Sequence, residues 1–356
     1  MWRFIGIKSF LRHACGVLFL WAAADSAVAA GFDGAQLEAS IKDETYRQIT
    51  SVLVAKDGRL DYAGYFGGAD ANTLHNTRSA TKSVTAMAVG AAIDDGLLNG
   101  VHSKAFAAFA RERPFRFASS AKDAITVRDL LTMSSALACN DNEWSSPGNE
   151  EHMHPAVKWL YFVLDLPLEE SYARNEQGFG PFRYCTAGSF LLGQVVERAA
   201  AQPIDRYTQQ RLLSPLGINT VRWYRSPSQE VQTGGGLEMT SRALLALAEL
   251  VRNDGRHGDR QLLSRAWVQE MLTVHVQANA AQGYGYQWWH QPMRCGPGTV
   301  DVWYMAGNGG NKVALIRELN LSVVVTATLY GTRGMHEQST SIIEDHVLAQ
   351  QAACRS

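Results

Sequence analysis

The sequence predicts a mixed α/β (α+β) fold, in which an antiparallel sheet from both chain ends is flanked by helices and joined to a mainly helical lobe. Three observations predict it. Residues 49–68 hold two β-rich runs around an Asp-Gly turn, which is a hairpin signal. Residues 312–330 hold two more β-rich runs. Much of the chain between them has helical character, so pairing the terminal strands in one sheet is the simplest way to bury them.

Turn residues or a capping residue bound several of the expected elements. In chain order we expect a helix (36–48), a hairpin (49–68, turn at Lys56-Asp57-Gly58), an apolar helix from Ser79, a short helix and turn (124–137), a polar loop (140–155), two helices (188–201 and 204–213), a glycine turn and a helix capped by Thr240 (233–255), two strands meeting at Asn320 (312–319 and 321–330) and a last helix (337–352).

A chain of 356 residues holds one or two domains by its length. We expect residues 30–356 to form a single domain of two interwoven lobes. The α/β lobe covers about 30–85 and 225–356, and the helical lobe about 86–224. The junction of two such lobes is a favoured place for an active site.

The first residues, 1–29, have the three regions of a secretory signal peptide. A basic start is followed by an apolar run over 14–24 and by small residues at cleavage spacing up to Ala29. The apolar run is shorter than the ~20 residues that span a bilayer, although an uncleaved anchor is the alternative. We therefore expect a bacterial protein that is periplasmic or secreted, with no stable membrane span after cleavage.

The composition is that of a globular protein, with 46% hydrophobic and 19% charged residues and a net charge of −1. No run of basic residues indicates a nucleic acid as partner, and the chain is not acidic enough to predict disorder. The composition therefore predicts no nucleic-acid partner.

Export changes how the cysteines are interpreted. Cys15 leaves with the signal peptide, and Cys139, Cys185, Cys295 and Cys354 remain, an even number in an oxidising compartment. The first two lie in the middle of the chain and the last two near its end. We expect one disulfide within each group, and free buried thiols are the alternative.

The apolar helix that begins at Ser79 carries Lys82 three residues on, where positions i and i+3 share a face. One interpretation is a capping serine followed by a solvated lysine. The other is a nucleophile and its base, because serine needs an adjacent base and a buried lysine loses its charge more readily. The free N–H of a first-turn serine can also hold a developing oxyanion.

The pattern Ser-x-x-Lys is weak evidence alone, since it recurs at Ser119 and Lys122. Only the copy at Ser79 begins a long apolar helix. A further candidate is Tyr184, which precedes an apolar helix. It is either a core ring or a phenol that carries a proton between serine, lysine and leaving group.

A glycine-rich run over 305–311 stands directly before the strand expected at 312–319. Glycine lets the backbone approach a ligand closely, and the N–H groups there can supply a second oxyanion donor. The alternative is a tight turn that enters an edge strand.

Together these motifs resemble the serine β-lactamase and penicillin-binding superfamily, in the class C-like branch that holds esterases and 6-aminohexanoate-dimer hydrolases. Ser79-Ala80-Thr81-Lys82 matches the nucleophile motif, and Tyr184-Cys185-Thr186 matches Tyr-x-Asn. Asn308-Gly309-Gly310 falls where the family has Lys-Thr-Gly or His-x-Gly. The resemblance covers roughly residues 45–345 and implies the β-lactamase/transpeptidase-like fold.

The resemblance also implies a mechanism without a metal or an organic cofactor. Ser79 would attack an ester or amide carbonyl, and Lys82 and Tyr184 would move its proton to the leaving group. The N–H groups of Ser79 and Asn311 would form the oxyanion hole. The residues expected to contact the substrate are Thr186, Asn308, Gly309 and Gly310.

Two departures from the family pattern bear on the substrate. Asn308 stands where the family has a cation that helps to bind the carboxylate of β-lactams and D-Ala-D-Ala peptides, and Thr186 replaces an asparagine. Lys312 could substitute, but adjacent residues of a strand point to opposite faces. A small neutral or short acyl substrate, from an ester, an amide or a short peptide, is therefore favoured. A β-lactamase or D-Ala-D-Ala carboxypeptidase is the alternative, and an inactive binding protein of this fold is the second.

Other candidate sites carry weaker signals. The Gly-x-Ser-x-Gly elbow of α/β-hydrolases does not occur in the sequence. His152 and His154 beside two glutamates are a weak metal signal, and residues 140–143 lack the calcium-loop pattern. Four aromatic residues are expected in the core, with some of them walling the acyl pocket: Trp288, Trp289, Trp303 and Tyr304.

Overall fold

The computed structural model of the protein describes Met1 and residues 31–355. The predicted signal peptide and Cys15 therefore lie outside the described residues, apart from Met1. The chain separates into Met1–Gly31 and one compact unit, Phe32–Ser356, and every described helix and strand lies in the second. None of the described helices is long and apolar enough to cross a membrane.

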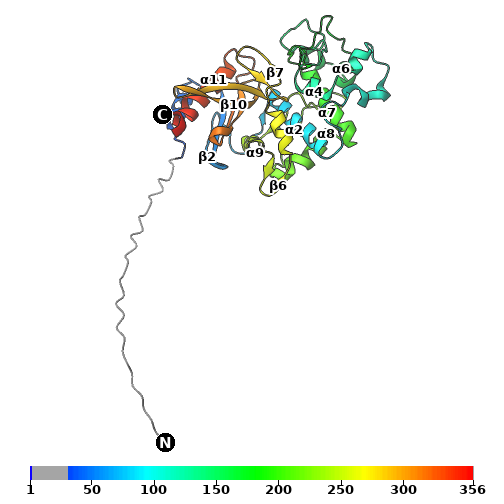
Figure 1. Ribbon diagram of the computed structural model, residues 1–356. Coiled ribbons are helices and arrows are strands. Elements are labelled where there is room, and N and C mark those ends of the chain that lie inside the picture. Colours follow the sequence, from blue (N-terminus) through cyan, green and yellow to red (C-terminus); the bar gives the residue numbers. More distant parts are fainter. Residues whose placement is uncertain (2–30, 356) are drawn as a thin grey trace. The chain divides into compact units, whose positions relative to one another are not determined.

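Within residues 31–355, eight strands form one antiparallel sheet in the order β2-β1-β12-β11-β10-β9-β8-β7 (Figure 1). Strand β1 (Ile49–Lys56), near the start of the chain, pairs with β12 (Leu321–Ala327), near its end. The prediction of a sheet built from both chain ends is confirmed. The other strands of the sheet are β2 (Arg59–Tyr65), β7 (Val276–Gln277), β8 (Gly283–Tyr284), β9 (Trp289–Cys295), β10 (Gly298–Gly307) and β11 (Asn311–Ile316).

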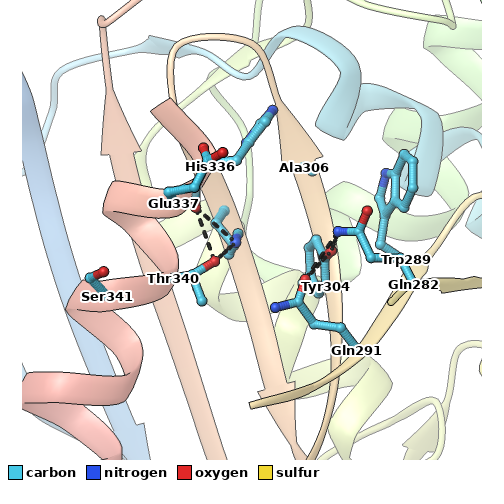
Figure 2. A pocket seen from close by; sticks show the side chains of 10 residues that line it. Gln282, Trp289, Gln291, Tyr304, Ala306, His336, Glu337, Thr340 and Ser341 are labelled. Carbon is cyan, nitrogen blue, oxygen red and sulfur yellow. Dashed lines mark hydrogen bonds between the residues drawn. The ribbon is translucent and has the colours of Figure 1, made fainter. Parts of the chain in front are cut away.

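Helices cover both faces of the central strands, which is why β11 and β12 are buried along their whole length. Ala314 and Val323 face a core shared with the first and last helices, and Leu315 and Val324 face the larger core on the other side. Figure 2 shows the first of these faces, with the last helix lying against the sheet. The covering helices are α1 (Ala35–Lys42) and α11 (Met335–Ser341) on one side, and α2 (Thr81–Asp94) and α9 (Ser241–Arg252) on the other.

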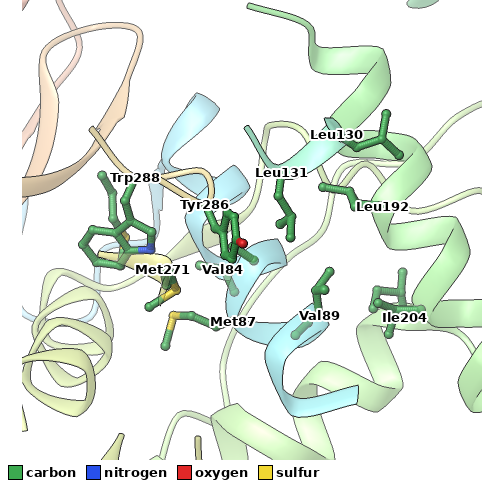
Figure 3. Packing of buried hydrophobic residues seen from close by; sticks show 14 of the residues in the cluster. Val84, Met87, Val89, Leu130, Leu131, Leu192, Ile204, Met271, Tyr286 and Trp288 are labelled. Carbon is green, nitrogen blue, oxygen red and sulfur yellow. The ribbon is translucent and has the colours of Figure 1, made fainter. Parts of the chain in front are cut away.

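Helix α2 runs through the centre of the larger core. Its residues from Thr81 to Ala92 are all buried, as expected of a helix that is apolar on every side. Figure 3 shows Val84, Met87 and Val89 among side chains of the neighbouring helices. The main partner of α2 is α7 (Thr186–Ala200). This packing fixes the start of α2, where Ser79 and Lys82 lie.

The remaining helices are short and belong mostly to the middle of the chain. They are α3 (Ser120–Asp123), α4 (Val127–Leu131), α5 (Glu150–Met153), α6 (Trp159–Leu164), α8 (Ile204–Thr208) and α10 (Arg265–Met271), with a 3₁₀ stretch at Ala105–Glu112. Two-residue ribbons pair β3 (His75–Asn76) with β4 (Glu238–Met239) and β5 (Arg256–His257) with β6 (Arg260–Gln261). Thr240 caps α9 as predicted, since its Oγ1 accepts a hydrogen bond from the N–H of Ala243 at 3.2 Å.

Several element boundaries differ from the prediction. The first helix, expected over 36–48, ends at Lys42, the loop expected over 140–155 contains α5, and the strand expected over 321–330 ends at Ala327. The strand expected over 312–319 ends at Ile316, and the chain then makes a 3₁₀ turn that closes at Asn320 in a left-handed conformation with φ of 49°. The last helix begins two residues early, at Met335, and passes into irregular helical turns after Ser341. Strands β7, β8, β9 and β10 are absent from the prediction altogether.

Two disulfides tie the unit together. Cys139 is bonded to Cys185, and Cys295 to Cys354. These are the pairs expected from the grouping of the cysteines along the chain. The first joins the loop after α4 to the start of α7, and the second joins the end of β9 to the C-terminus.

Candidate active site

Ser79 lies in a short 3₁₀ turn, Arg78–Ala80, that runs directly into α2. Arg78 has a φ of 50°, a left-handed conformation that costs a non-glycine residue about 1 kcal/mol or more. Its N–H donates to Asn76 Oδ1 at 3.0 Å, and its carbonyl accepts from Thr81 Oγ1 at 2.6 Å, so the strained turn is held from both sides. Among the described residues, the N–H of Ser79 has no hydrogen-bond partner and is free for a ligand oxygen.

The amine of Lys82 is buried and surrounded by oxygen atoms. Its side chain is 1% exposed, and Nζ donates to Ser79 Oγ at 3.1 Å, to Thr186 Oγ1 at 2.9 Å and to the carbonyl of Gly234 at 2.5 Å. Three acceptors match the three N–H groups of an ammonium. The interpretation of Lys82 as a solvated surface residue is therefore wrong.

Tyr184 lies at the same amine. Lys82 Nζ is 4.8 Å from the centroid of its ring, within the range of a cation–π interaction. Trp289 stacks on Tyr184 with ring centroids 5.8 Å apart and an angle of 29° between the planes. The structure thus brings Ser79, Lys82 and Tyr184 together. Of the aromatic residues expected in the core, Trp288 is fully buried and Trp289 packs beside the site.

The glycine turn after Thr233 supplies the third acceptor of the Lys82 amine, the carbonyl of Gly234. A Cβ on Gly234 would lie 2.7 Å from Cγ2 and 2.8 Å from the carbonyl oxygen of Thr186, so only glycine lets this segment approach α7 so closely. The sequence predicts a turn here and no chemical role. The run of three glycines is the signal that was available for a close backbone approach.

The second Ser-x-x-Lys copy has a structural role. Ser119 caps α3, and its Oγ accepts from the N–H of Lys122 at 3.1 Å. The amine of Lys122 donates to the carbonyls of Leu164 and Leu166, at 2.5 and 2.6 Å. Burial lowers the pKa of Lys122 to about 8. The two copies therefore differ in what the lysine amine contacts: a serine hydroxyl at Lys82, and backbone carbonyls at Lys122.

The third motif forms the turn between β10 and β11. Gly309 and Gly310 have φ of 93° and 92°, and a Cβ on either would meet Ala327 or Met335 backbone oxygen within 2.9 Å, so the tight turn itself requires both glycines. Asn311 is 2% exposed. Its Nδ2 donates to the carbonyls of Asn76 and Asn308.

A cavity of about 350 Å³ lies next to Ser79. Thr186 and Asn308 are part of its wall, whereas Gly309, Gly310 and Asn311 are not. The wall also carries four ionisable groups, on the turn before α2 and on or beside α5: Arg78, Glu150, Glu151 and His154. The cavity wall therefore carries more charge than we expected from the loss of polar groups at Thr186 and Asn308.

Asp141 is a residue near the site that the motifs do not predict. It belongs to the loop between α4 and α5, which the sequence marks only as a weak calcium signal. Its carboxylate is mostly buried, and burial raises the pKa of Asp141 to about 6, although the charge of Lys82 opposes the shift. A carboxylate close to the amine of Lys82 is thus part of the site's electrostatics.

Lys312 lies away from Ser79, on the other face of the sheet. Its amine donates to the carbonyl of His336 at 3.2 Å and to Thr340 Oγ1 at 2.5 Å, both on α11. It helps to line a separate cavity of about 490 Å³, shown in Figure 2. Burial lowers the pKa of Lys312 to about 7. Lys312 therefore does not replace the cation that the third motif lacks, because adjacent residues of a strand point to opposite faces.

The residues that gave the weak metal and calcium signals contact other side chains in the structure. His154 Nδ1 lies 4.0 Å from Glu151 Oε2, and the ring of His152 packs edge-on against Trp144. Glu143 Oε1 accepts a hydrogen bond from Asn140 at 2.8 Å. No three His, Cys, Asp or Glu side chains lie together as a metal site within residues 31–355.

The chain is similar in sequence to known proteins. The sequence model described as Beta-lactamase matches residues 35–346. The 6-aminohexanoate-dimer hydrolase of Paenarthrobacter ureafaciens is 23% identical over 273 residues, which are 69% of this chain and 65% of that protein. The chain thus matches just under two thirds of the length of this curated relative.

Solved structures share the fold over nearly the whole described unit. EstCE1, a hydrolase with promiscuous acyltransferase activity, has a TM-score of 0.69 at 18% identity, over 88% of this chain and 97% of its own. A D-stereospecific amidohydrolase from Streptomyces has a TM-score of 0.66 at 16% identity, over 88% of this chain and 98% of its own. At these identities the likeness is one of fold.

Proposed function

The chain belongs to the beta-lactamase family of serine hydrolases, and from that premise we propose that it cleaves an ester or amide bond through an acyl-enzyme on Ser79. The observation that supports this most strongly is the buried amine of Lys82, whose Nζ lies 3.1 Å from Ser79 Oγ. A serine becomes a competent nucleophile when a base is within hydrogen-bond reach.

In the acylation step, Ser79 Oγ attacks the carbonyl carbon of the substrate. Its proton passes to Lys82 or Tyr184, and this pair protonates the leaving alcohol or amine as the bond to the carbonyl carbon breaks. Water then attacks the acyl group on Ser79 and releases the carboxylic acid and the free serine. Thr186 and Gly234 orient the lysine amine throughout, because each accepts one of its hydrogen bonds.

The oxyanion of each tetrahedral intermediate is assigned to backbone N–H groups. The N–H of Ser79 is free for this purpose and lies on the residue that makes the bond. The N–H of Asn311, at the start of β11, is the proposed second donor. Asn311 is not in the wall of the cavity, and its role as second donor follows from the family resemblance.

The cavity next to Ser79 favours a small substrate with polar groups. Its volume of about 350 Å³ holds a short acyl or peptide-like molecule. The preferred reaction is hydrolysis of a short ester or amide, and no metal or organic cofactor takes part in it.

A β-lactamase or D-Ala-D-Ala carboxypeptidase is the second candidate, and one observation favours it. Arg78 lines the cavity, and its guanidinium lies 4.3 Å from the ring centroid of Tyr330 without a carboxylate partner among the described residues. An unpaired guanidinium is a suitable partner for the carboxylate of such substrates.

We also propose that the protein is exported and acts in the periplasm or outside the cell. Residues 1–29 have the regions of a signal peptide, and disulfides such as Cys139–Cys185 and Cys295–Cys354 persist in oxidising compartments.

Hydrolysis of a short-chain nitrophenyl ester by the exported form, with Ser79→Ala beside it, tests the proposal. We expect turnover by the wild type and a loss of about 10³-fold or more in the variant, because the acyl-enzyme can no longer form. Equal turnover by both proteins would refute the assignment of Ser79, and absence of turnover by both would favour the carboxypeptidase or an inactive protein. Amides and β-lactams then separate the two candidate reactions.

A further inference from the structure

A mostly buried carboxylate beside the proposed catalytic centre has no part in the mechanism above. Both oxygens of Asp141 accept hydrogen bonds from the backbone: Oδ2 from the N–H of Thr186 at 2.7 Å, and Oδ1 from the N–H of Glu150 at 3.0 Å. The N–H of Asp141 itself donates to the carbonyl of Tyr184 at 2.8 Å. Asp141 is thus bonded to two residues that contact the amine of Lys82.

These bonds fix the segment that surrounds that amine. Thr186 is the first residue of α7, so its N–H has no acceptor within the helix, and the carboxylate of Asp141 satisfies it at the positive end of the helix dipole. The same residue accepts from Lys82 Nζ through its Oγ1. Thr186 therefore contacts both Asp141 and Lys82, so a displacement of Asp141 also moves an acceptor of the Lys82 amine.

Protonation of Asp141 conflicts with this arrangement. A proton on either oxygen removes the negative charge of the acceptor, so the charge-assisted hydrogen bonds from the N–H groups of Thr186 and Glu150 become weaker neutral ones. The charged groups that act on Asp141 are Lys82 of α2, which favours the ionised form, and Glu150 of α5, which opposes it. Burial has the largest effect and raises the pKa of Asp141 to about 6, so its charge changes near neutral pH.

We propose that Asp141 is a positioning residue, whose ionised carboxylate holds Thr186 and the amine of Lys82 in the arrangement that makes Ser79 reactive. It acts through these residues and does not touch the substrate. The inference rests on the proposed acyl-enzyme at Ser79. It predicts that the reactivity of Ser79 rises as the pH passes the titration of Asp141. A carboxylate that only capped α7 would change the rate without changing its pH dependence.

A fluorophosphonate probe tests this without knowledge of the natural substrate. Ser79 Oγ attacks phosphorus, a phosphonate ester forms, fluoride leaves, and the serine proton passes to the base. The rate of labelling at Ser79, mapped by mass spectrometry, is followed from about pH 5 to about pH 8. We expect the wild-type rate to rise about tenfold between pH 5 and pH 7, because a single ionisation centred near 6 changes the ionised fraction by that factor.

Three variants separate the outcomes. In Asp141→Asn, which cannot ionise, labelling is expected to be slow and independent of pH. Glu143→Gln removes an exposed acid of the same loop and is expected to keep the wild-type profile. Glu150→Gln removes the charge that opposes ionisation of Asp141 and is expected to move the midpoint to lower pH, a result that does not depend on whether Asp141→Asn folds.

An Asp141→Asn profile with the wild-type midpoint, or a Glu150→Gln profile that does not move, overturns the inference while the Ser79 assignment stands. If folded wild-type protein is not labelled at Ser79 at any pH, the acyl-enzyme proposal fails and the inference fails with it. Circular dichroism of each variant establishes that the protein measured is folded.

Discussion

At the scale of single residues, the same four-residue pattern serves two different purposes in this chain. Lys82 and Lys122 are both buried, and each lies three residues after a serine. Lys82 donates to a serine hydroxyl at a cavity, whereas Lys122 donates to two backbone carbonyls and holds the end of α6. The chemistry therefore depends on the acceptors around the amine and not on the pattern itself.

The two lysines give a matched pair of substitutions. We expect Lys82→Met to lower ester turnover by about 10³-fold or more, because Ser79 loses its base, with the fold retained. Lys122→Met is expected to keep turnover and to lower the free energy of unfolding by about 1–3 kcal/mol, because two buried carbonyls lose their donor. Urea titrations and ester kinetics on both variants measure this. Turnover within about tenfold of the wild type in Lys82→Met would contradict the assignment.

Some residues of the site could be predicted from the sequence, and others could not. Ser79 and Lys82 are predictable because a serine and a lysine one turn apart begin a long apolar helix. Asp141 and Gly234 are not, because their partners lie 45 and 152 residues away along the chain. The run of glycines at Gly234 indicates a close backbone approach but does not identify what is approached. Both lie in segments that the sequence marks correctly as a loop and a turn.

At the scale of elements, the site is assembled from the turn before α2, the start of α7 and the glycine segment after Thr233. Each segment is fixed by packing elsewhere: α2 and α7 pack against each other in the larger core, and the disulfide Cys139–Cys185 anchors the residue between Tyr184 and Thr186. The disulfide Cys295–Cys354 has no such relation to the site, since it joins β9 to the C-terminus.

Removal of each disulfide separates stability from activity. The bonded cysteines are 46 and 59 residues apart, so replacing either pair by alanine is expected to lower the free energy of unfolding by a similar amount, about 2–4 kcal/mol. Only loss of Cys139–Cys185 is expected to lower kcat as well, by about tenfold or more, because Tyr184 and Thr186 then lose their anchor. Kinetics at a temperature where both variants are folded test this. Equal kcat values for the two variants would show that the anchor is unimportant.

Among the elements, the strands at the chain ends were predictable and β9 was not. β1, β11 and β12 are runs of apolar residues, many of them β-branched, bounded by turn residues, which is a strong strand signal. β9 contains Pro292 among polar residues, and proline lowers the expectation of a strand. It is tolerated because β8, on the outer side of β9, has only two residues, so much of that edge is unpaired.

At the scale of the whole molecule, the sheet separates two buried polar regions. Ser79 and its cavity lie towards the helical side, and Lys312 lies under α11 on the other side. Adjacent residues of β11 contact the two regions, because the alternation of a strand sends them to opposite faces. Asn311 donates to the carbonyls of Asn76 and Asn308, which line the Ser79 cavity, and Lys312 lines the other cavity. Stability and catalysis can therefore be changed independently at these positions.

Lys312 is expected to limit the stability of the protein in a pH-dependent way. Burial lowers its pKa in the folded state to about 7, from 10.5, so between these values the unfolded chain binds more protons and stability rises with pH. Lys312→Met removes the cost of the buried charge. Unlike Lys122→Met, it leaves no carbonyl without a donor, because the carbonyl of His336 also accepts from the hydroxyls of Ser339 and Thr340. We expect it to raise the free energy of unfolding by about 1–4 kcal/mol below pH 7, with the gain shrinking towards pH 10. Urea titrations at several pH values measure the gain, and ester turnover is expected to stay unchanged. A gain independent of pH, or a large loss of turnover, would count against this account.

Mass spectrometry of a reaction quenched in acid shows whether Ser79 carries the acyl group during turnover. Wild-type protein is mixed with excess nitrophenyl acetate and quenched during the first turnovers, and the digested protein is searched for an acetylated peptide. We expect acetyl on Ser79 of the wild type and none on the Ser79→Ala variant. Turnover that continues with acetyl on another residue, or with no acetyl-enzyme under conditions where product release shows a burst, would contradict it.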